Sequence, residues 1–326
     1  MSKNWEPTCN LEILHLRAQL LDKIRRFFSE KSVLEVETPL LSHSCGTDPQ
    51  LDFFKTAFSF PPLEESLFLQ TSPEFAMKRL LASGSGSIYQ IAKAFRNGES
   101  GRLHNPEFTL LEWYRVDFTL TDLMDEIAEL LTVLLKDYVD LSEPQRFSYQ
   151  AIFQRYTGLN PLVFSYQDYC DYAQTKNIPE AITLCGDDHG LWLDFIFSHH
   201  IQPYLGQEAL CMIYGYPACQ SSLARINLFD SKITDRVEVF IKGIELGNGY
   251  YELTDAQEQS KRFDEEMAVR QQRNRPSSVK DWRLITAMEQ GLPECSGMAI
   301  GLDRLLMILT GSVAINDVLS FSIDRA

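Results

Sequence analysis

The sequence predicts an α+β fold in which antiparallel strands have helices packed around them. Three observations support this: segments with apolar residues at three- and four-residue spacing, segments in which apolar and polar residues alternate, and a hairpin-like connection rich in Gly, Asn and Pro. The 326 residues are 44% apolar, enough to bury the core of one large domain. Because no internal repeat or Gly/Ser linker divides the chain, we expect a single domain over residues 1–326.

Helix and strand signals place the first elements along the chain. Ser72 can cap a helix that has Pro73 at its first position, because each residue is favoured there. Pro39 would interrupt a strand, since proline donates no ladder hydrogen bond. The expected elements are a helix at 11–30, a strand at 33–41, a helix from Ser72 to Gly84, and strands at 88–95 and 107–115 joined by a loop at 97–106.

The second half contains one long segment that is hard to assign. Residues 140–205 mix aromatic, polar, Gly and Pro residues without a sustained period, and we expect an insertion packed on the main sheet. A capping box of Thr254 and Gln257 opens a late helix. The other expected features are a helix at 119–138, a strand at 237–241 ended by a break at 243–249, the i,i+4 pairs Glu258–Arg262 and Glu266–Arg270, and a strand-to-helix segment at 298–309.

Charge, cysteine content and hydropathy exclude several classes of protein. A formal net charge of −15 opposes nucleic-acid binding, which needs clustered Lys and Arg, so no tRNA partner is expected. The seven cysteines form no C-x-x-C pair, which indicates reduced thiols rather than disulfides or a zinc site. No apolar run reaches the roughly 18 residues of a membrane span and no signal peptide opens the chain, so we expect a cytoplasmic location.

Polar and apolar residues share one face of the second hairpin strand. A period of two puts Phe108, Leu110, Glu112 and Tyr114 on the same side. Buried polar groups need partners, and a bound ligand can supply them. Arg96, at the other side of the hairpin loop, would then lie against a nucleotide, although the residue types alone also fit a solvated surface turn.

Three carboxylates recur at seven-residue intervals, at Glu238, Glu245 and Glu252. In an unbroken strand this step sends successive side chains to opposite faces, so convergence requires that Gly247 and Gly249 bend or bulge the chain. A convergent set can hold Mg²⁺ against a polyphosphate or receive an ammonium group. Without a bend, the same residues would be scattered surface acids on a half-exposed strand.

A glycine-containing turn precedes Arg304. Glycines at 297 and 301 let the backbone approach a ligand closely, and the arginine that follows supplies a fixed cation. A packed strand-to-helix junction, with Arg304 paired to an acid, accounts for the pattern equally well.

The order of these segments resembles the class II aminoacyl-tRNA synthetases, and the likeness covers nearly the whole chain. Phe28 to Pro39 is similar to their motif 1, Phe95-Arg96 with the Phe108 strand to motif 2, and Gly297 to Arg304 to motif 3. The resemblance implies a catalytic core made of an antiparallel β-sheet flanked by helices. Further runs resemble the lysyl branch in particular, at 71–74, 102–109, 112–114, 245–249 and 252–256.

Within that branch, the chain is most similar to the elongation factor P (R)-β-lysine ligases, which are paralogues of lysyl-tRNA synthetase. Motif 1 begins near residue 28, so no N-terminal anticodon-binding domain is expected. Ala299 stands where the synthetases usually carry Gly and these ligases carry Ala. The resemblance implies ATP and Mg²⁺, β-lysine or lysine as the amino acid, elongation factor P as the acceptor, and a homodimer.

The resemblance also implies roles for individual residues. Arg96 would bind the α-phosphate of ATP and Arg304 the outer phosphates. Gly98 departs from the Phe-Arg-x-Glu pattern of motif 2, and we expect Glu99 or backbone to substitute. The other implied contacts are Asn97, Gly98, Glu99, His104, Asn105, Phe108, Glu245, Leu246 and Gly301 for ATP, Ser72, Pro73, Glu74, Tyr114, Glu252 and Ala299 for the amino acid, and Glu238 and Glu245 for Mg²⁺.

Three functions fit this resemblance: a protein-modifying ligase, a short synthetase that charges tRNA, and a non-catalytic amino-acid sensor. The sensor is disfavoured because both arginines and the carboxylates occur together, whereas a sensor needs no phosphate clamp. The tRNA enzyme is disfavoured by the negative charge and by the expected lack of an anticodon-binding domain.

Overall fold

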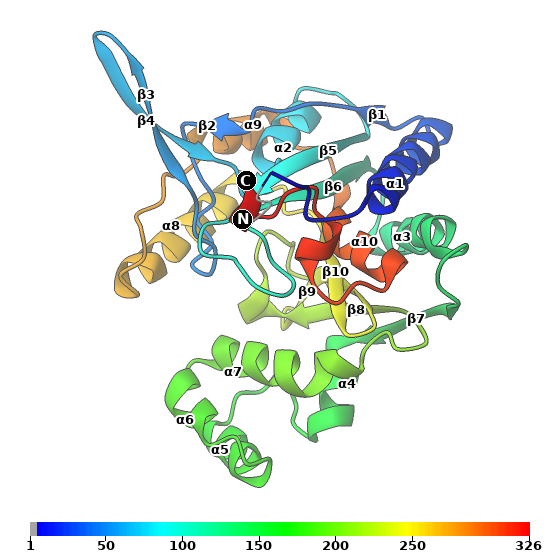
Figure 1. Cartoon of the computed structure of the whole chain (residues 1–326). Coiled ribbons are helices and arrows are strands. Elements are labelled where there is room, and N and C mark those ends of the chain that lie inside the picture. Colours follow the sequence, from blue (N-terminus) through cyan, green and yellow to red (C-terminus); the bar gives the residue numbers. More distant parts are fainter. Residues whose placement is uncertain (1–4) are drawn as a thin grey trace. The chain divides into compact units, whose positions relative to one another are not determined.

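The computed structural model describes residues 5–326, which form two compact units. The first comprises the chain up to Phe118, Glu129–Val139 and Thr254–Ala326, and the second comprises Thr119–Ala128 and Asp140–Leu253. Helix α3 (Leu120–Leu135) begins in the second unit and ends in the first. Each unit contains paired strands with helices beside them, which confirms the predicted α+β class (Figure 1).

The main sheet of the first unit contains the predicted hairpin. Its strands are β1 (Leu34–Glu35), β5 (Ile88–Phe95), β6 (Glu107–Val116) and β11 (Cys295–Gly301), in the order β1-β5-β6-β11. Pairing is antiparallel except between β1 and β5. In this register Gln90, Glu112 and Ala299 lie in one row across three neighbouring strands. Opposed residues share a face of the sheet, so these three side chains are neighbours.

Five helices and a small ribbon complete the first unit. Asn10 caps the first helix by accepting a hydrogen bond from the Ile13 N–H, and Phe28 stacks on Tyr89 of β5 at 4.4 Å between ring centroids. The helices are α1 (Leu11–Glu30), α2 (Glu74–Ala82), α8 (Ala256–Gln272), α9 (Trp282–Gly291) and α10 (Leu302–Thr310). The ribbon, ordered β2-β4-β3, consists of β2 (Leu41–Ser42), β3 (Lys55–Phe60) and β4 (Leu63–Leu69).

The second unit has its own strands and a group of short helices. Its strands are β7 (Ser142–Ser148), β8 (Ala209–Pro217), β9 (Ile233–Ile241) and β10 (Ile244–Tyr251), ordered β10-β9-β8-β7. Its helices between β7 and β8 are α4 (Tyr149–Thr157), α5 (Tyr166–Thr175), α6 (Glu180–Cys185) and α7 (His189–Ile196), followed by a π-helical turn at Phe197–Ile201.

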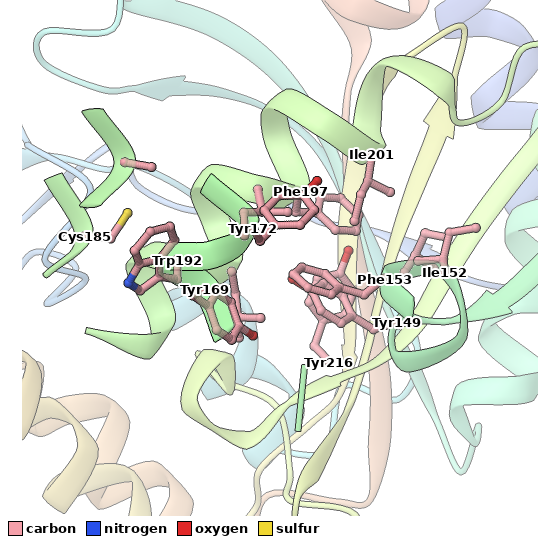
Figure 2. Close-up of a cluster of buried hydrophobic side chains, with 14 of the residues drawn as sticks. Tyr149, Ile152, Phe153, Tyr169, Tyr172, Cys185, Trp192, Phe197, Ile201 and Tyr216 are labelled. Atoms are coloured by element: carbon pink, nitrogen blue, oxygen red, sulfur yellow. The ribbon is translucent and has the colours of Figure 1, made fainter. Parts of the chain in front are cut away.

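An aromatic cluster joins these short helices to β8 and β9. Tyr149 stacks on Phe197 at 5.1 Å and lies 4.7 Å from Tyr216 of β8, and Trp192 is fully buried (Figure 2). Each helix contributes only a few core residues, so no segment of 140–205 is long enough to display a helical period. That explains why the sequence of this region was hard to assign.

Two N-terminal predictions were wrong in extent. The expected strand at 33–41 consists of two separate pieces, β1 and β2, with Pro39 between them. The helix expected from Ser72 begins at Glu74, and Pro73 occupies the N-cap position without a side-chain hydrogen bond. The Ser72 hydroxyl accepts a hydrogen bond from the Glu74 N–H at 3.0 Å, and it also donates to the carboxylate of Glu112 on β6.

The predicted break at 243–249 was also wrong. A tight turn at Lys242 and Gly243, both with positive φ, joins β9 directly to β10, and the later glycines lie inside that strand. Left-handed backbone of this kind is typical of the two central residues of a hairpin turn.

The helix that follows β10 differs from its predicted capping and pairing. Asp255 rather than Thr254 caps α8, since its carboxylate accepts hydrogen bonds from two N–H groups of the first turn. The Glu258–Arg262 pair is confirmed at 3.0 Å. The pair expected between Glu266 and Arg270 does not form, because Arg270 binds Asp52 and other groups before the ribbon instead.

All seven cysteines are free thiols, as predicted. None of the helices in residues 5–326 combines the length and the apolar character that crossing a membrane requires.

Candidate active site

Two arginines from separate segments of the first unit meet at one group of side chains. Arg96 follows β5, and Arg304 lies in the first turn of α10. Arg96 Nη1 lies 3.8 Å from Glu99 Oε1, the second oxygen of Glu99 lies 3.9 Å from His104 Nε2, and Arg304 Nη2 lies 2.7 Å from the same nitrogen. The Arg96 guanidinium also lies 5.0 Å from the ring centroid of Phe108, within cation–π range. The two cations therefore belong to one cluster, and their roles toward a nucleotide stay predictions.

Glu99 directly follows Gly98, the position at which this sequence departs from the Phe-Arg-x-Glu pattern of motif 2. Gly98 has φ of +81°, and a Cβ there would meet nothing within 4 Å. This left-handed backbone favours glycine, so the loop turns at Gly98 and presents the next residue instead. The Glu99 carboxylate lies between Arg96 and His104, and its expected substitution for the motif 2 Glu stays a prediction.

His104 connects the end of the hairpin loop to Arg304. A guanidinium only donates, so the contact of 2.7 Å is a hydrogen bond from Arg304 Nη2 to the Nε2 atom of His104. Arg304 Nε also donates to the Leu103 carbonyl at 3.3 Å. Arg304 thus holds the end of the hairpin loop, and its predicted contact with the outer phosphates stays untested.

Asn105 and Asn97 support the hairpin loop through backbone contacts. The Asn105 side chain donates to the Glu107 carbonyl at 2.6 Å and accepts from the Ile323 N–H at 3.1 Å, and the residue is buried. The Asn97 N–H donates to the Asp52 carbonyl at 2.9 Å. The structure therefore shows anchoring contacts for both asparagines, while their predicted contact with ATP stays untested.

The turn before Arg304 is fixed by a buried acid. Gly301 is the N-cap of α10, and the Asp303 carboxylate accepts from the Thr109 N–H of β6 at 2.7 Å. Arg17 of α1 pairs with the other oxygen of Asp303. This network ties the start of α10 to the sheet, so it holds Arg304 in place next to the hairpin.

Glu112 organises the polar residues on the face of β6. Its side chain is 2% exposed, and it accepts hydrogen bonds from the Ser72 hydroxyl and the Tyr114 hydroxyl, both at 2.8 Å. Ala299 lies directly across the strand from it. Three residues predicted to contact the amino acid are thus gathered around one carboxylate that was not among the predicted site residues.

A buried lysine accompanies the carboxylate of Glu74. Lys78, one helical turn later on α2, is 1% exposed, and its Nζ lies 2.7 Å from Glu74 Oε1. That contact is ionic rather than a well-aligned hydrogen bond, since the buried Oε1 atom has no hydrogen-bond partner of suitable geometry. Lys78 compensates the charge of Glu74 in part and fixes its side chain beside Ser72.

Two of the predicted site carboxylates, Glu238 and Glu245, lie on one face of the paired strands β9 and β10. Glu245 lies opposite Phe240, and Asn248 lies opposite Glu238, because the register shifts between Glu245 and Gly247. Glu238 and Phe240 are two residues apart on β9, so the shift keeps both acids on the same side. The predicted bulge is therefore found next to Gly247, at the buried Leu246, whereas Gly249 pairs regularly with Val237.

Glu252 extends this face beyond the end of β10. It is 1% exposed and pairs with Ala224 in an isolated bridge. It lies two residues after Tyr250, which is opposite Arg236 on the same face as Glu238. The three predicted carboxylates thus lie on the same face within the second unit, and their convergence with the two arginines stays a prediction.

Glu238 is engaged by two neighbours that the sequence analysis missed. The Tyr216 hydroxyl donates to Oε2 at 2.6 Å, and the Arg236 guanidinium pairs with Oε1. Burial raises the pKa of Glu238 from its ordinary 4.5 to about 7, Arg236 opposes the shift, and Glu245 adds to it. The effect of Glu245 on this pKa shows that the two carboxylates are electrostatic neighbours.

Two adjacent carboxylates fit Mg²⁺ bound to a nucleotide. Mg²⁺ keeps several waters and is held by one or two carboxylates together with substrate phosphates rather than by a complete protein cage. Residues 5–326 contain no group of three or more His, Cys, Asp or Glu side chains arranged around a metal position. Glu238 and Glu245 would supply the oxygen donors of a two-carboxylate site, and this role stays a prediction.

The raised pKa values predict how stability depends on pH. Burial also raises the pKa of Glu266 to about 7, opposed by a hydrogen bond from Thr47. Both carboxyl groups hold protons in the folded state that the unfolded chain releases, so the free energy of unfolding should fall as pH rises from about 5 to about 8. Urea denaturation across this range should show a smaller fall for Glu238→Gln and for Glu266→Gln, and the smallest for the double variant.

The comparison with the parent protein isolates this effect. Burial lowers the pKa of His189 and His200, which makes stability rise with pH below about 6.5, but this term is common to parent and variants. Equal slopes for the parent and the double variant would contradict the assignment of the shifts to these two carboxyls.

The signals for the missed residues differ. Glu112 could have been found, because its alternation with Tyr114 on β6 was visible in the sequence. Lys78 has the i,i+4 spacing from Glu74, which also marks a surface pair. Tyr216 lies on a strand that the sequence analysis did not identify, so no local pattern pointed to it.

Comparison with known proteins identifies one family over nearly the whole described chain. The family described as tRNA synthetases class II (D, K and N) matches residues 8–325. The chain is 43% identical over 326 residues to the elongation factor P–(R)-β-lysine ligase of Pasteurella multocida, with 99% of each protein covered. It is 44% identical over 327 residues to the protein of that name from Vibrio cholerae, with 100% of this chain and 99% of the relative covered.

Proposed function

The chain belongs to the class II tRNA synthetase family of the D, K and N type, and on this basis we propose that it is an ATP-dependent protein ligase. It activates (R)-β-lysine, or lysine, as the aminoacyl-adenylate and transfers it to a lysine ε-amine of elongation factor P, the protein in the name of its full-length relatives. The observation that carries this proposal is the cluster in which Glu99 and His104 join Arg96 to Arg304.

In the first half-reaction an oxygen of the substrate carboxylate attacks the α-phosphorus of ATP, the bond from that phosphorus to the bridging oxygen breaks, and pyrophosphate leaves. The protein supplies positioning and charge neutralisation. Arg96 binds the α-phosphate, Phe108 stacks on the adenine, and Arg304 binds the outer phosphates. Mg²⁺ held by Glu238 and Glu245 would add further neutralisation of the phosphate charge.

Carboxylates select the amino acid. Glu74 accepts the amino group near the substrate carboxylate, and Glu252 with Tyr114 accepts the distal ammonium. A buried carboxylate favours a cationic partner, so a substrate with two ammonium groups fits this set. Ala299, in the row with Glu112, bounds the pocket with a methyl group where glycine would leave space.

In the second half-reaction the ε-amine of the acceptor attacks the activated carbonyl, an amide bond forms, and AMP leaves. The chain needs no nucleophile of its own for this step. The net charge of −15 supports a protein rather than tRNA as the acceptor. Because the acceptor is a translation factor, we place the reaction in the cytoplasm, and the family resemblance supports a homodimer.

One assay tests the proposed function. The chain is supplied with ATP and labelled (R)-β-lysine or lysine, together with elongation factor P and tRNA in separate reactions. We expect ATP-dependent label on elongation factor P and none on tRNA, with (R)-β-lysine preferred. Label on tRNA would support the short synthetase instead. Pyrophosphate exchange without transfer would refute the acceptor, and the absence of both would support an amino-acid sensor.

A further inference from the structure

A buried arginine of α8, Arg270, binds the loop that precedes the β3–β4 ribbon. Its side chain is 1% exposed, and Nη1 donates to the carbonyls of Asp48 and Leu51 at 2.6 and 2.7 Å. Nη2 donates to Asp52 Oδ1 at 3.0 Å, and the guanidinium lies 5.2 Å from the ring centroid of Phe53. A single guanidinium therefore fixes residues 48–53, which we call the strap.

The strap in turn contacts the loop that contains Arg96, the proposed partner of the α-phosphate. The Asp52 carbonyl accepts from the Asn97 N–H at 2.9 Å, and the two residues form an isolated antiparallel bridge. Asn97 is the residue after Arg96. A continuous series of hydrogen bonds thus runs from Arg270 through Asp52 to the backbone beside Arg96, entirely within the first unit.

A second side chain of α8 holds the same region. Glu266, one turn before Arg270, accepts a hydrogen bond from the hydroxyl of Thr47, the residue before the strap. Phe53 packs edge-on against Phe68 of β4, so the far end of the strap is held by apolar contact. The strap is fastened at several points, and Asp52 is the member that reaches the Asn97 backbone.

We propose that Arg270 is a positioning residue for adenylate formation, which acts by holding the strap and thereby the placement of Arg96. The inference rests on the proposed function, because Arg96 matters only if the chain binds ATP. Arginine is required because its planar fork donates in several fixed directions at once, whereas a lysine ammonium at the same site is a single point charge on a flexible stem. A displacement of Arg96 would impair phosphate binding while leaving the pocket around Glu112 intact.

The experiment compares Arg270→Lys, Asp52→Ala and Arg275→Ala with the full-length parent in amino-acid-dependent pyrophosphate exchange. Arg275 is the matched control, since it also binds Asp52, at 2.9 Å, but its side chain is 47% exposed and reaches only the carboxylate of that residue among the described residues of the strap. We expect the KM for ATP to rise about tenfold in Arg270→Lys, and less in Asp52→Ala, with the KM for the amino acid within about twofold of the parent. Arg275→Ala should resemble the parent.

Thermal unfolding and equilibrium binding of ATP alone distinguish a misplaced Arg96 from a general loss of folded protein. Both are measured with the same proteins, and kinetics are recorded at a temperature where all are folded. A folded Arg270→Lys protein with the parental KM for ATP, or with equal rises in both KM values, would overturn the proposal. If Arg270→Lys does not fold, Asp52→Ala decides by the same criteria. A parent protein that fails to bind ATP would instead refute the proposed function.

Discussion

Replacement of Arg96 by Ala is expected to lower the rate of ATP–pyrophosphate exchange by about 10²–10³-fold. The guanidinium is the proposed partner of the α-phosphate, where negative charge increases as the substrate carboxylate attacks. Within residues 5–326 its guanidinium interacts with the Glu99 carboxylate at 3.8 Å and the Phe108 ring at 5.0 Å, so its loss should not unfold the chain. The measurement is exchange of labelled pyrophosphate into ATP, with unfolding temperature recorded for the same proteins.

Lys93→Ala is the matched control for this prediction. Lys93 lies on β5 shortly before Arg96, and its exposed ammonium pairs with Glu107 at 3.1 Å. The control should retain parental exchange. If Arg96→Ala retained it as well, the proposed phosphate contact would be wrong and the cluster around Glu99 would be a structural ion-pair network.

The elements that could be predicted from the sequence are those whose signals are local. The helix at 11–30 has an apolar stripe and a capping Asn10, and strands β5 and β6 flank a loop rich in turn-forming residues. The junction at 298–309 also forms as predicted, with Gly301 between strand and helix. In each case one stretch of sequence contains the information that determines the local structure.

The wrong predictions concern residues whose local structure is determined by contacts with distant segments of the chain. The sequence predicted that Arg270 pairs with Glu266 on the surface of the helix. Instead, the strap, more than 200 residues away in the sequence, offers Arg270 two backbone carbonyls and one carboxylate oxygen. Burial with several hydrogen bonds outweighs an exposed i,i+4 pair, which contributes only about 0.3–0.5 kcal/mol. Likewise, glycines read as the end of a strand instead permit a bulge within β10.

The same distinction applies to the candidate site. Motif order and residue type were sufficient to propose Arg96, Arg304 and the three glutamates as site residues. They could not indicate Arg236. Its guanidinium and the Tyr216 hydroxyl, which comes from another strand, both bind the carboxylate of Glu238. Partners of this kind alter the pKa of a carboxylate and therefore its readiness to bind a cation, yet they are determined by sheet register rather than by any local motif.

Glu252→Gln is expected to raise the KM for (R)-β-lysine roughly 10- to 100-fold, because a hydrogen bond between charged groups contributes more than one to a neutral amide. Glu252 is 1% exposed, so water would screen its interaction with the distal ammonium only weakly. The measurement is amino-acid-dependent pyrophosphate exchange with (R)-β-lysine and with a β-amino acid of the same length that lacks the distal amine. The variant should lose most of the parent's preference for the dication, whereas Glu265→Gln, exposed on α8 and paired with Lys261, should keep it. Equal losses with both substrates would show that Glu252 supports the pocket without reading the distal charge.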